Sequence, residues 1–244
     1  MITEICIADT ETTGIDPAKD SLLEVAQVFM PVDKPDNLIG DWTYIEYNGV
    51  IPPEAKAVHH IVEKDVEHGA ERCVPRDVHI KAMLDLHHDG YAYAFHNAPF
   101  DLGFLPELKD VPVICTYQCA LHLYPDAPSY KNQVLRYWLG VEPKASMLEG
   151  LSPHRALYDS AVTAALLEQM LMLCSPEDLV ELTKRPVLLK TVNFGKYKGE
   201  SWKNVPSDYR GWMRRSGNWS DDANVMYTLD VLDGRREHVP LIQR

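Results

Sequence analysis

Two acidic side chains close the first strand-like run of the sequence. Residues 3–9 alternate in polarity and are rich in β-branched side chains, which is typical of a strand, and Asp9-Thr10-Glu11 stand at its end. Alternate residues of a strand point to the same face, so Asp9 and Glu11 can present both carboxylates to one spot. A strand end that opens into a Thr/Gly turn is a usual place for a site in α/β proteins. By itself the tripeptide is also typical of a solvated turn.

Two further acidic positions occur at similar places later in the chain. Asp101 comes after the strand-like run 91–96 and stands at the start of a predicted helix. Asp159 lies near the start of the predicted helix 155–173, and His154 precedes it by about 7.5 Å along a helix axis. That spacing lets Asp159 hold a metal while His154 reaches a water or phosphate beside it. Singly, each feature also suits an acidic residue at a helix N-terminus or a polar surface.

Taken together, the four carboxylates and the histidine indicate a metal centre. Clustered carboxylates raise one another's pKa, and divalent cations that bind between them remove this cost. Hard oxygen ligands of this kind suit Mg²⁺ or Mn²⁺. Two such ions about 3.5–4 Å apart can hold a phosphodiester, one activating a water and the other stabilising the leaving oxygen. The pattern therefore predicts two divalent cations and chemistry at a phosphodiester.

The elements that must position these groups alternate along the chain. Strands are predicted at 3–9, 22–32, 42–47, 91–96 and 111–116. Helices are predicted at 53–68, 76–88, 100–108, 116–123, 130–139 and 155–173. Three strands followed by alternating helices and strands predict an α/β fold, in which a mixed five-stranded sheet is flanked by helices.

The C-terminal part differs in composition and is predicted to form a small module. Residues 1–173 hold 12 Lys and Arg against 26 Asp and Glu, whereas residues 174–244 hold 12 against 10. We therefore predict a main domain over 1–175, a linker over 176–190 and a basic-aromatic module over 191–244. The net charge of −12 by itself argues against a nucleic-acid partner. A basic segment, and metal ions bound to an acidic body, weaken that argument.

Composition excludes several classes of protein. Hydrophobic residues make up 45% and charged residues 25%, the usual mix of a globular protein, which argues against collagen, coiled coil and wholly disordered chains. No run approaches the roughly 20 apolar residues of a membrane span. The first residues lack a signal-peptide pattern, and the five cysteines lack disulfide spacing, so we expect a cytoplasmic protein with reduced thiols and no membrane partner. Cys115, Cys119 and His122 share a helical face that could suggest zinc, but a buried stripe is favoured.

The three acidic motifs, in this order, resemble those of the DEDDh exonucleases, also called DnaQ-like 3′→5′ exonucleases. The resemblance covers about residues 3–173 and rests on Asp9-x-Glu11, Asn97-Ala-x-Phe-Asp101 and His154-x-x-x-x-Asp159. Intermediate segments agree with it, namely Thr12-Thr13-Gly14, Glu24-Val25-Ala26 and Val58-His59-His60-Ile61. A looser likeness to the bacterial exodeoxyribonucleases extends to Phe194–Gly199 and Trp212.

The resemblance implies a ribonuclease H-like fold with an antiparallel second strand, and a role for each matched residue. Asp9 would bridge two Mg²⁺ or Mn²⁺ ions, Glu11 and Asp159 would complete the first site, and Asp101 would hold the second ion. His154 would act as general base on the attacking water. The products would be nucleoside 5′-monophosphates released from a 3′ end.

Other positions are candidates for binding the nucleic acid. Four match places where the family touches the terminal nucleotide, although turn and cap chemistry explains them equally well: Thr12, Gly14, His60 and Asn97. In the module, Lys196 and Lys198 lie among aromatic residues, a mixture that suits single strands through phosphate neutralisation and base stacking. The same turn, Phe194–Gly199, can also serve only to fold the module.

The expected partner is DNA, with single-stranded or frayed 3′ ends, and a homodimer is a possible assembly. An exoribonuclease or oligoribonuclease of the same superfamily is an open alternative, because the carboxylates act on the phosphate and do not distinguish the sugars. A noncatalytic nucleic-acid-binding protein with this fold is a second alternative, which the five filled catalytic positions disfavour.

Overall fold

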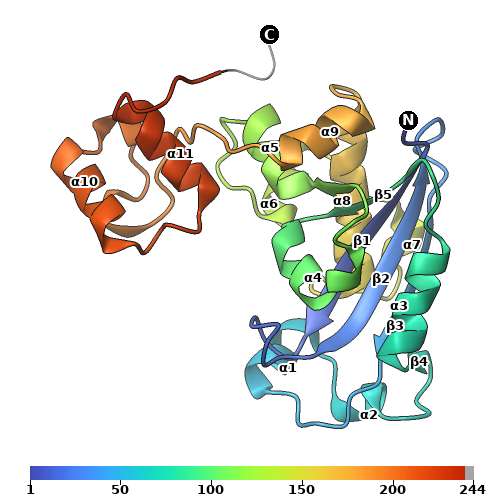
Figure 1. Ribbon diagram of the computed structural model, residues 1–244. Helices are drawn as coiled ribbons and strands as arrows, with labels where there is room; N and C mark the ends of the chain where they lie inside the picture. The colour runs from blue at the N-terminus through green and yellow to red at the C-terminus, as the bar shows by residue number, and fades with distance from the viewer. Residues whose placement is uncertain (240–244) are drawn as a thin grey trace. The chain divides into compact units, whose positions relative to one another are not determined.

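One mixed sheet of six strands carries the candidate site (Figure 1). The computed structural model describes residues 1–239. The strands are β1 (Glu4–Thr12), β2 (Leu22–Pro31), β3 (Ile39–Ile45), β4 (Cys73–Val74), β5 (Tyr91–Phe95) and β6 (Val113–Cys115). Their order across the sheet is β4-β3-β2-β1-β5-β6. β2 runs antiparallel to both of its neighbours, and the other pairs are parallel. The predicted α/β class, with a mixed sheet and an antiparallel second strand, is confirmed.

The prediction of five strands is wrong, because β4 adds a sixth strand at one edge. It has only two residues, Cys73 and Val74, which pair with Tyr44 and Ile45 of β3. A strand this short has no alternation of polar and apolar residues that could reveal it in a sequence.

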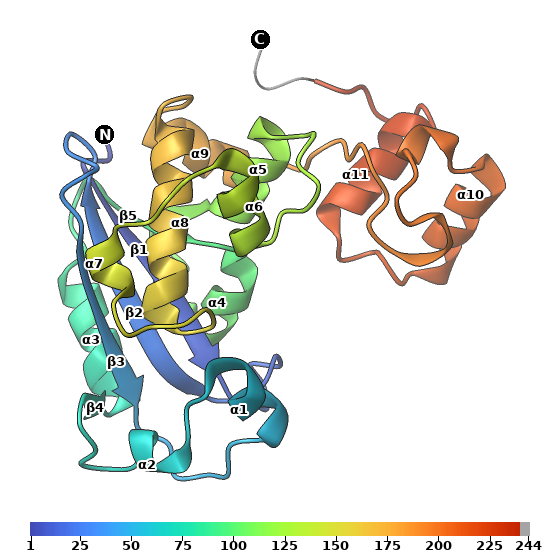
Figure 2. The ribbon, with the colours of Figure 1, turned by 180° about the vertical axis from the view of Figure 1, so that it is seen from behind.

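Helices cover both faces of the sheet, α8 lying on one and α3 on the other (Figure 1; Figure 2). The helices of this part of the chain are α1 (Pro53–His59), α2 (Glu63–Val66), α3 (Arg76–Asp85), α4 (Ala98–Phe104), the 3-10 helix η1 (Pro106–Leu108), α5 (Thr116–Leu123), α6 (Asn132–Leu139), α7 (Ala145–Leu148), α8 (Ala156–Leu171) and α9 (Pro176–Thr183).

The strand β5, between β1 and β6, is buried on both faces and leads into the candidate site. Its sequence, Tyr-Ala-Tyr-Ala-Phe, is buried throughout, and its aromatic residues join one core with Ile80 and Met83 of α3. Because side chains alternate along a strand, the two alanines point to the opposite face. On the face opposite α3, the alanine-rich helix α8 packs against β1, β2 and β3. The carboxyl end of β5 then leads directly into α4 and Asp101.

The predicted helix 53–68 is interrupted, and the interruption lies at His60. This residue has φ +62, in the left-handed region, and closes α1 as its C-cap. The buried ring of His59 holds the turn, since its Nδ1 accepts a hydrogen bond from the backbone N–H of Ile61 at 3.0 Å. α2 begins only at Glu63. A left-handed residue other than glycine is uncommon, which is why the sequence pattern predicted one continuous helix.

The structure also differs from the predicted linker 176–190, whose first half forms α9. Ser175 and Asp178 cap this helix reciprocally, each side chain accepting from the other's backbone N–H at 3.2 Å. Ser-x-x-Asp with Pro at the first helical position is a recognisable helix start that the composition-based reading passed over. Thr183 at its end donates to the Leu179 carbonyl and accepts from the backbone N–H of Cys115 in β6.

The chain divides into two units. The first comprises Met1–Cys119 and Ser129–Thr183, and the second comprises Ala120–Pro128 and the chain from Lys184 onward. The second unit contains the 3-10 helices η2 (Gly195–Tyr197) and η3 (Trp202–Asn204) and the helices α10 (Ser207–Ser216) and α11 (Ala223–Leu232). The last residues of the predicted module, 240–244, lie outside the described residues.

No single helix within residues 1–239 has both the length and the apolar composition needed to cross a membrane. The bent pair α8 and α9 meets that test only when both helices are counted together, and α8 is a core helix with ten buried residues.

Candidate active site

Three of the predicted metal ligands converge at the carboxyl end of β1. Asp9 and Glu11 lie on the same face of this strand, and Asp159 reaches them from the first turn of α8. One carboxylate oxygen of each residue lies within 4.8 Å of the others. Within residues 1–239 this is the one group of His, Cys, Asp and Glu side chains close enough to share an ion.

Asp101, the fourth carboxylate, stands beside this group but is held from the opposite face of β1. It is only 2% exposed, and its Oδ1 accepts a hydrogen bond from the hydroxyl of Thr10 at 2.8 Å. Thr10 is the residue between Asp9 and Glu11, so its side chain points away from theirs. The strand therefore positions all three residues of the Asp-Thr-Glu motif: Asp9 and Glu11 share one face, and Thr10 binds Asp101.

The electrostatics of the four groups are those of a site short of positive charge. Burial, together with the charges of Asp101, Glu11 and Asp159, raises the pKa of Asp9 well above its usual value. Burial and the charges of Glu24 and Asp159 raise the pKa of Glu11 to about 9. Burial raises the pKa of Asp101 to about 7 and also raises that of Asp159. None of the four has an ion-pair partner within the described residues. All-oxygen donors that repel one another are a suitable set for a hard divalent cation.

Both oxygens of Asp159 are fixed by hydrogen bonds. Oδ1 accepts from Nε2 of Gln133 on α6 at 3.2 Å, and Oδ2 accepts from the backbone N–H of His154 at 3.0 Å. His154 itself is exposed and has φ +64, in the left-handed region. This conformation turns the chain just before α8, so that the amide of His154 meets the carboxylate five residues later.

Glu24 and Arg155 complete the surroundings of the site, and sequence reasoning assigned neither a role. Glu24 is Glu11's partner in the β1–β2 register, so two carboxylates face each other across the strands. Arg155 forms an ion pair with Glu24, donating from Nη2 to Oε1 at 2.6 Å and from Nε to Oε2 at 3.2 Å. Oε2 also accepts from the backbone N–H of Ala156, the first residue of α8. The position of Arg155 directly after His154 was the feature of the sequence that could have indicated its place beside the site.

The four residues predicted to touch the terminal nucleotide have different surroundings. The hydroxyl of Thr12, the last residue of β1, donates to the Gly14 carbonyl at 2.6 Å and so holds the turn that follows the strand. His60 and Asn97 are exposed, and both have left-handed backbones, as C-cap of α1 and N-cap of α4. Turn and cap chemistry therefore accounts for part of each position, and their contacts with a nucleotide stay predictions.

The module has its own apolar core, built from many of the aromatic residues that were expected to stack on bases. Trp202 is 1% exposed and packs with Val192, Val205, Met213 and Leu229. Phe194 stacks on Trp219, with ring centroids 5.3 Å apart. Lys196 and Lys198, by contrast, are exposed. The module thus combines an aromatic interior with exposed lysines on its surface.

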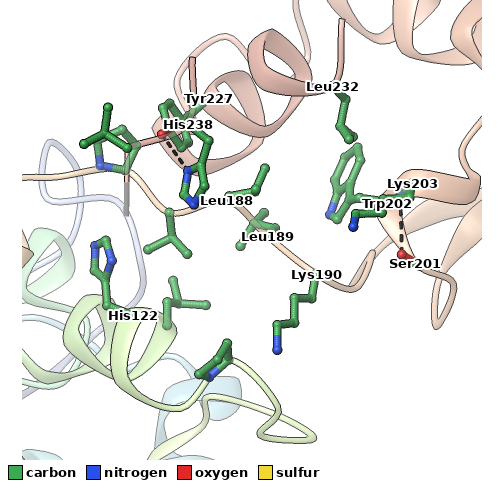
Figure 3. Close-up of a pocket in the computed structure, with 15 residues that line it drawn as sticks. His122, Leu188, Leu189, Lys190, Ser201, Trp202, Lys203, Tyr227, Leu232 and His238 are labelled. Carbon is green, nitrogen blue, oxygen red and sulfur yellow. Dashed lines mark hydrogen bonds between the residues drawn. The ribbon is translucent and has the colours of Figure 1, made fainter. Parts of the chain in front are cut away.

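A pocket of about 580 Å³ lies within the second unit (Figure 3). Leu188, Leu189 and Trp202 contribute apolar walls, and the Tyr227 hydroxyl lies 3.0 Å from Nδ1 of His238 at its rim. The pocket is lined neither by the carboxylates nor by Lys196 and Lys198. Cys119 and His122, considered above for zinc, have backbone carbonyls of Leu179 and Arg185 as hydrogen-bond partners.

Comparisons with known proteins agree with this geometry. A family model described as Exonuclease matches residues 6–167. Exodeoxyribonuclease 10 of Escherichia coli K12 is 32% identical over 210 residues, which cover 85% of this chain and 88% of the relative. DNA polymerase III PolC-type of Bacillus subtilis is 27% identical over 68% of this chain, but the match spans only 11% of that polymerase.

Solved structures give the same result. The structure of exonuclease X in complex with 5′-overhanging duplex DNA superposes with a TM-score of 0.60 and 29% identity, covering 73% of this chain and 99% of that one. Escherichia coli exonuclease I in complex with a dA16 oligonucleotide superposes with a TM-score of 0.54 at 16% identity, a likeness of fold. The matched range 6–167 spans the positions of all four carboxylates and His154, and the family model and the relative together show that the chain belongs to the exonuclease family.

Proposed function

We propose that this protein is a metal-dependent 3′→5′ exodeoxyribonuclease that releases nucleoside 5′-monophosphates from the 3′ ends of DNA. The observation that carries the proposal is the convergence of Asp9, Glu11 and Asp159 within 4.8 Å, with Asp101 buried beside them. Membership of the exonuclease family supports hydrolysis of a phosphodiester as the reaction. We expect a cytoplasmic location, since all five cysteines are free thiols.

The proposed cofactors are two Mg²⁺ or Mn²⁺ ions, for which an all-oxygen donor set is suitable. Asp9 would contact both ions, Glu11 and Asp159 would hold the first, and Asp101 would hold the second. When bound, such a pair supplies an activated water and charge stabilisation at the leaving oxygen. The raised pKa values of the carboxyl groups support this assignment, because cations would offset the mutual repulsion that raises them.

His154 is the proposed general base. It is exposed, it immediately precedes α8, and its backbone N–H binds the Asp159 carboxylate. A side chain there can accept a proton from a water held beside Asp159 without occupying a ligand position. The loop before it contains Gly150, whose φ of +74 lies in the left-handed region that favours glycine.

The proposed substrate is DNA with a single-stranded or frayed 3′ end. Support comes from the name of the Escherichia coli relative and from the overhanging duplex bound to exonuclease X. We propose that Thr12, Gly14, His60 and Asn97 contact the terminal nucleotide, since they lie at the end of β1 or in the turns that follow β1, α1 and β5. Lys196 and Lys198 of the module are proposed to contact DNA phosphates.

Degradation of 5′-labelled single strands would test the proposal. DNA and RNA of one sequence would be incubated with Mg²⁺, Mn²⁺ or EDTA. Asp9→Ala and His154→Ala are the test variants, and the exposed Asp33→Ala and His87→Ala are matched controls. We expect a metal-dependent ladder on DNA that shortens by single nucleotides, lost in both test variants and kept in both controls.

Other outcomes would redirect or end the proposal. Shortening of RNA alone would favour the exoribonuclease alternative with the same residues. Binding of both strands without shortening of either would favour a noncatalytic protein and reject the enzyme. Light scattering on the same preparation would test the homodimer.

A further inference from the structure

The module exposes a narrower set of nucleic-acid-binding groups than its sequence offers. Residues 184–215 hold nine Lys and Arg against two Asp and Glu. Two of the arginines form ion pairs within the module. Arg210 donates to Asp233 at 2.8 Å, and Arg214 binds both Asp230 and Asp233. Both arginine side chains are only 13% exposed. They join α10 to α11 and are unavailable to a ligand.

The aromatic residues of the module also differ in exposure, and Trp212 is the one that remains at the surface. Most of the module's aromatic side chains are buried or half-buried in the core around Trp202. Trp212 on α10 is 44% exposed, although its indole touches Tyr209 and Trp219 at centroid distances of 5.1 and 5.8 Å. The ring is thus held by neighbours at its sides while much of its surface faces solvent.

Two cations lie near the aromatic residues around this indole. Arg215 follows Trp212 by three residues and so lies on the same face of α10. Its Nη1 lies 3.2 Å from where a Cβ at Gly211 would stand, so the guanidinium folds over the glycine next to Trp212. Tyr209, which touches Trp212, also touches Tyr197 with ring centroids 4.8 Å apart, and Nζ of Lys196 lies 5.3 Å from the centre of the Tyr197 ring. Neither cation has an acidic partner within the described residues.

We infer that Trp212, with Arg215 and Lys196, forms a binding site for single-stranded nucleic acid within the module. Trp212 stacks on a base, and the two cations neutralise phosphates on either side of it. An exposed ring held by other aromatic rings loses little conformational entropy when a base stacks on it. Base stacking on an aromatic side chain tolerates any base, so the site selects single strands rather than a sequence. This inference rests on the proposed nucleic-acid substrate, but the site itself needs neither the metal ions nor the carboxylates.

Binding by the full chain in EDTA, where no hydrolysis takes place, would test the site. The probes are fluorescently labelled oligothymidylate and oligouridylate, and the readout is anisotropy over a range of salt concentrations. Trp212→Ala should weaken binding by about fivefold or more, whereas Trp212→Phe should keep most of the affinity. Arg215→Ser should lower the slope of log Kd against log salt by about 0.7. Trp138→Ala on α6, where the indole is also 44% exposed, is the matched control and should bind as wild type.

The outcomes separate this site from the rest of the protein. Equal affinity of Trp212→Ala and wild type would overturn the inference, as would equal losses in Trp212→Ala and Trp138→Ala. If Trp212→Ala unfolds the module, Arg215→Glu decides, because this exposed side chain supports no core contact; unchanged binding then rejects the site. Quenching of tryptophan fluorescence by the oligonucleotide should disappear in Trp212→Phe. The wild-type chain could bind the oligonucleotide more tightly than Trp212→Ala and yet fail to shorten DNA in Mg²⁺. That result would reject the proposed function and support this binding site.

Discussion

Arg155, the residue after the candidate base His154, donates two hydrogen bonds of 2.6 and 3.2 Å to Glu24 of β2. Glu24 is 1% exposed and faces Glu11 across the strands, so this arginine neutralises a carboxylate that would otherwise add to the negative charge of the site. Because Glu24 also accepts from the first amide of α8, one buried side chain ties that helix to the sheet. Asp159 and His154 take their positions from that attachment.

Glu24→Gln should therefore destabilise the fold strongly. The substitution keeps the shape of the side chain but leaves Arg155, whose side chain is 18% exposed, without its counter-charge. Breaking a buried pair from one side costs about 3–5 kcal/mol of unfolding free energy, which urea denaturation would measure. Tyr44→Phe is the control, since it removes a single hydrogen bond to Arg155 and should cost about 1 kcal/mol. Equal losses in the two variants would contradict the dominant role of the ion pair.

Gln133 should matter for metal affinity, since it orients one oxygen of Asp159. Gln133→Leu keeps the bulk of the side chain and removes this hydrogen bond. Loss of such an outer partner typically weakens metal binding by about 10–100-fold, so the Mn²⁺ concentration that gives half-maximal activity should rise by that factor. Gln169→Leu on α8, also half-buried, is the control and should leave it unchanged. A fall in maximal rate at unaltered Mn²⁺ dependence would assign Gln133 another role.

The parts of the site that could be predicted from sequence are those set by local geometry. Asp9 and Glu11 had to share a face because they are alternate residues of a strand, and their place at a strand end was visible from the turn that follows. Asp101 and Asp159 could be located at helix starts by the same local signals. Resemblance to a family then supplied the roles that spacing alone left open.

The parts that could not be predicted depend on contacts between distant segments. Glu24 and Arg155 are 131 residues apart, and no pattern in either segment reveals that they meet. The module shows the converse problem, because burial decides the role of each residue. Trp202 and Trp212 look alike in the sequence, but one is 1% exposed and the other 44%. Composition therefore showed that the module is rich in basic and aromatic residues, but it did not identify which of them lie on the surface.

Without metal, the carboxylate cluster should make the protein less stable as the pH rises. Glu11 has an ordinary value of 4.5 and a folded-state pKa of about 9, so the folded state retains a proton that the unfolded chain has lost. Its contribution is fully present below pH 4.5 and is lost as the pH rises through about 9. In EDTA the melting temperature should fall across this window, and saturating Mg²⁺ should reduce the fall.

Asp9→Asn offers a direct check of the same repulsion. Removing this charge should raise the melting temperature in EDTA at pH 8 to 9 (about the upper end of the Glu11 titration) while abolishing activity. The exposed Asp33→Asn is the matched control and should change neither quantity. A lower melting temperature for Asp9→Asn at high pH would mean that Asp9 makes favourable contacts that outweigh its repulsion.

Asp233 should hold the module together, because it joins α11 to two arginines of α10. Burial alone raises the pKa of Asp233, but hydrogen bonds from Arg210 and Arg214 outweigh it and hold the pKa below its usual value. This contribution is present at neutral pH and is lost as the pH falls through the lowered value, so the module should open in acid.

At neutral pH, Asp233→Asn should speed amide hydrogen exchange in α10 and α11 and leave the exchange of β1, β2 and β5 unchanged. Asp221→Asn, an exposed position of the same module, is the control. Equal exchange in both variants would show that the apolar core around Trp202 suffices to hold the two helices, and a matching increase in the sheet would show that the two units do not unfold separately.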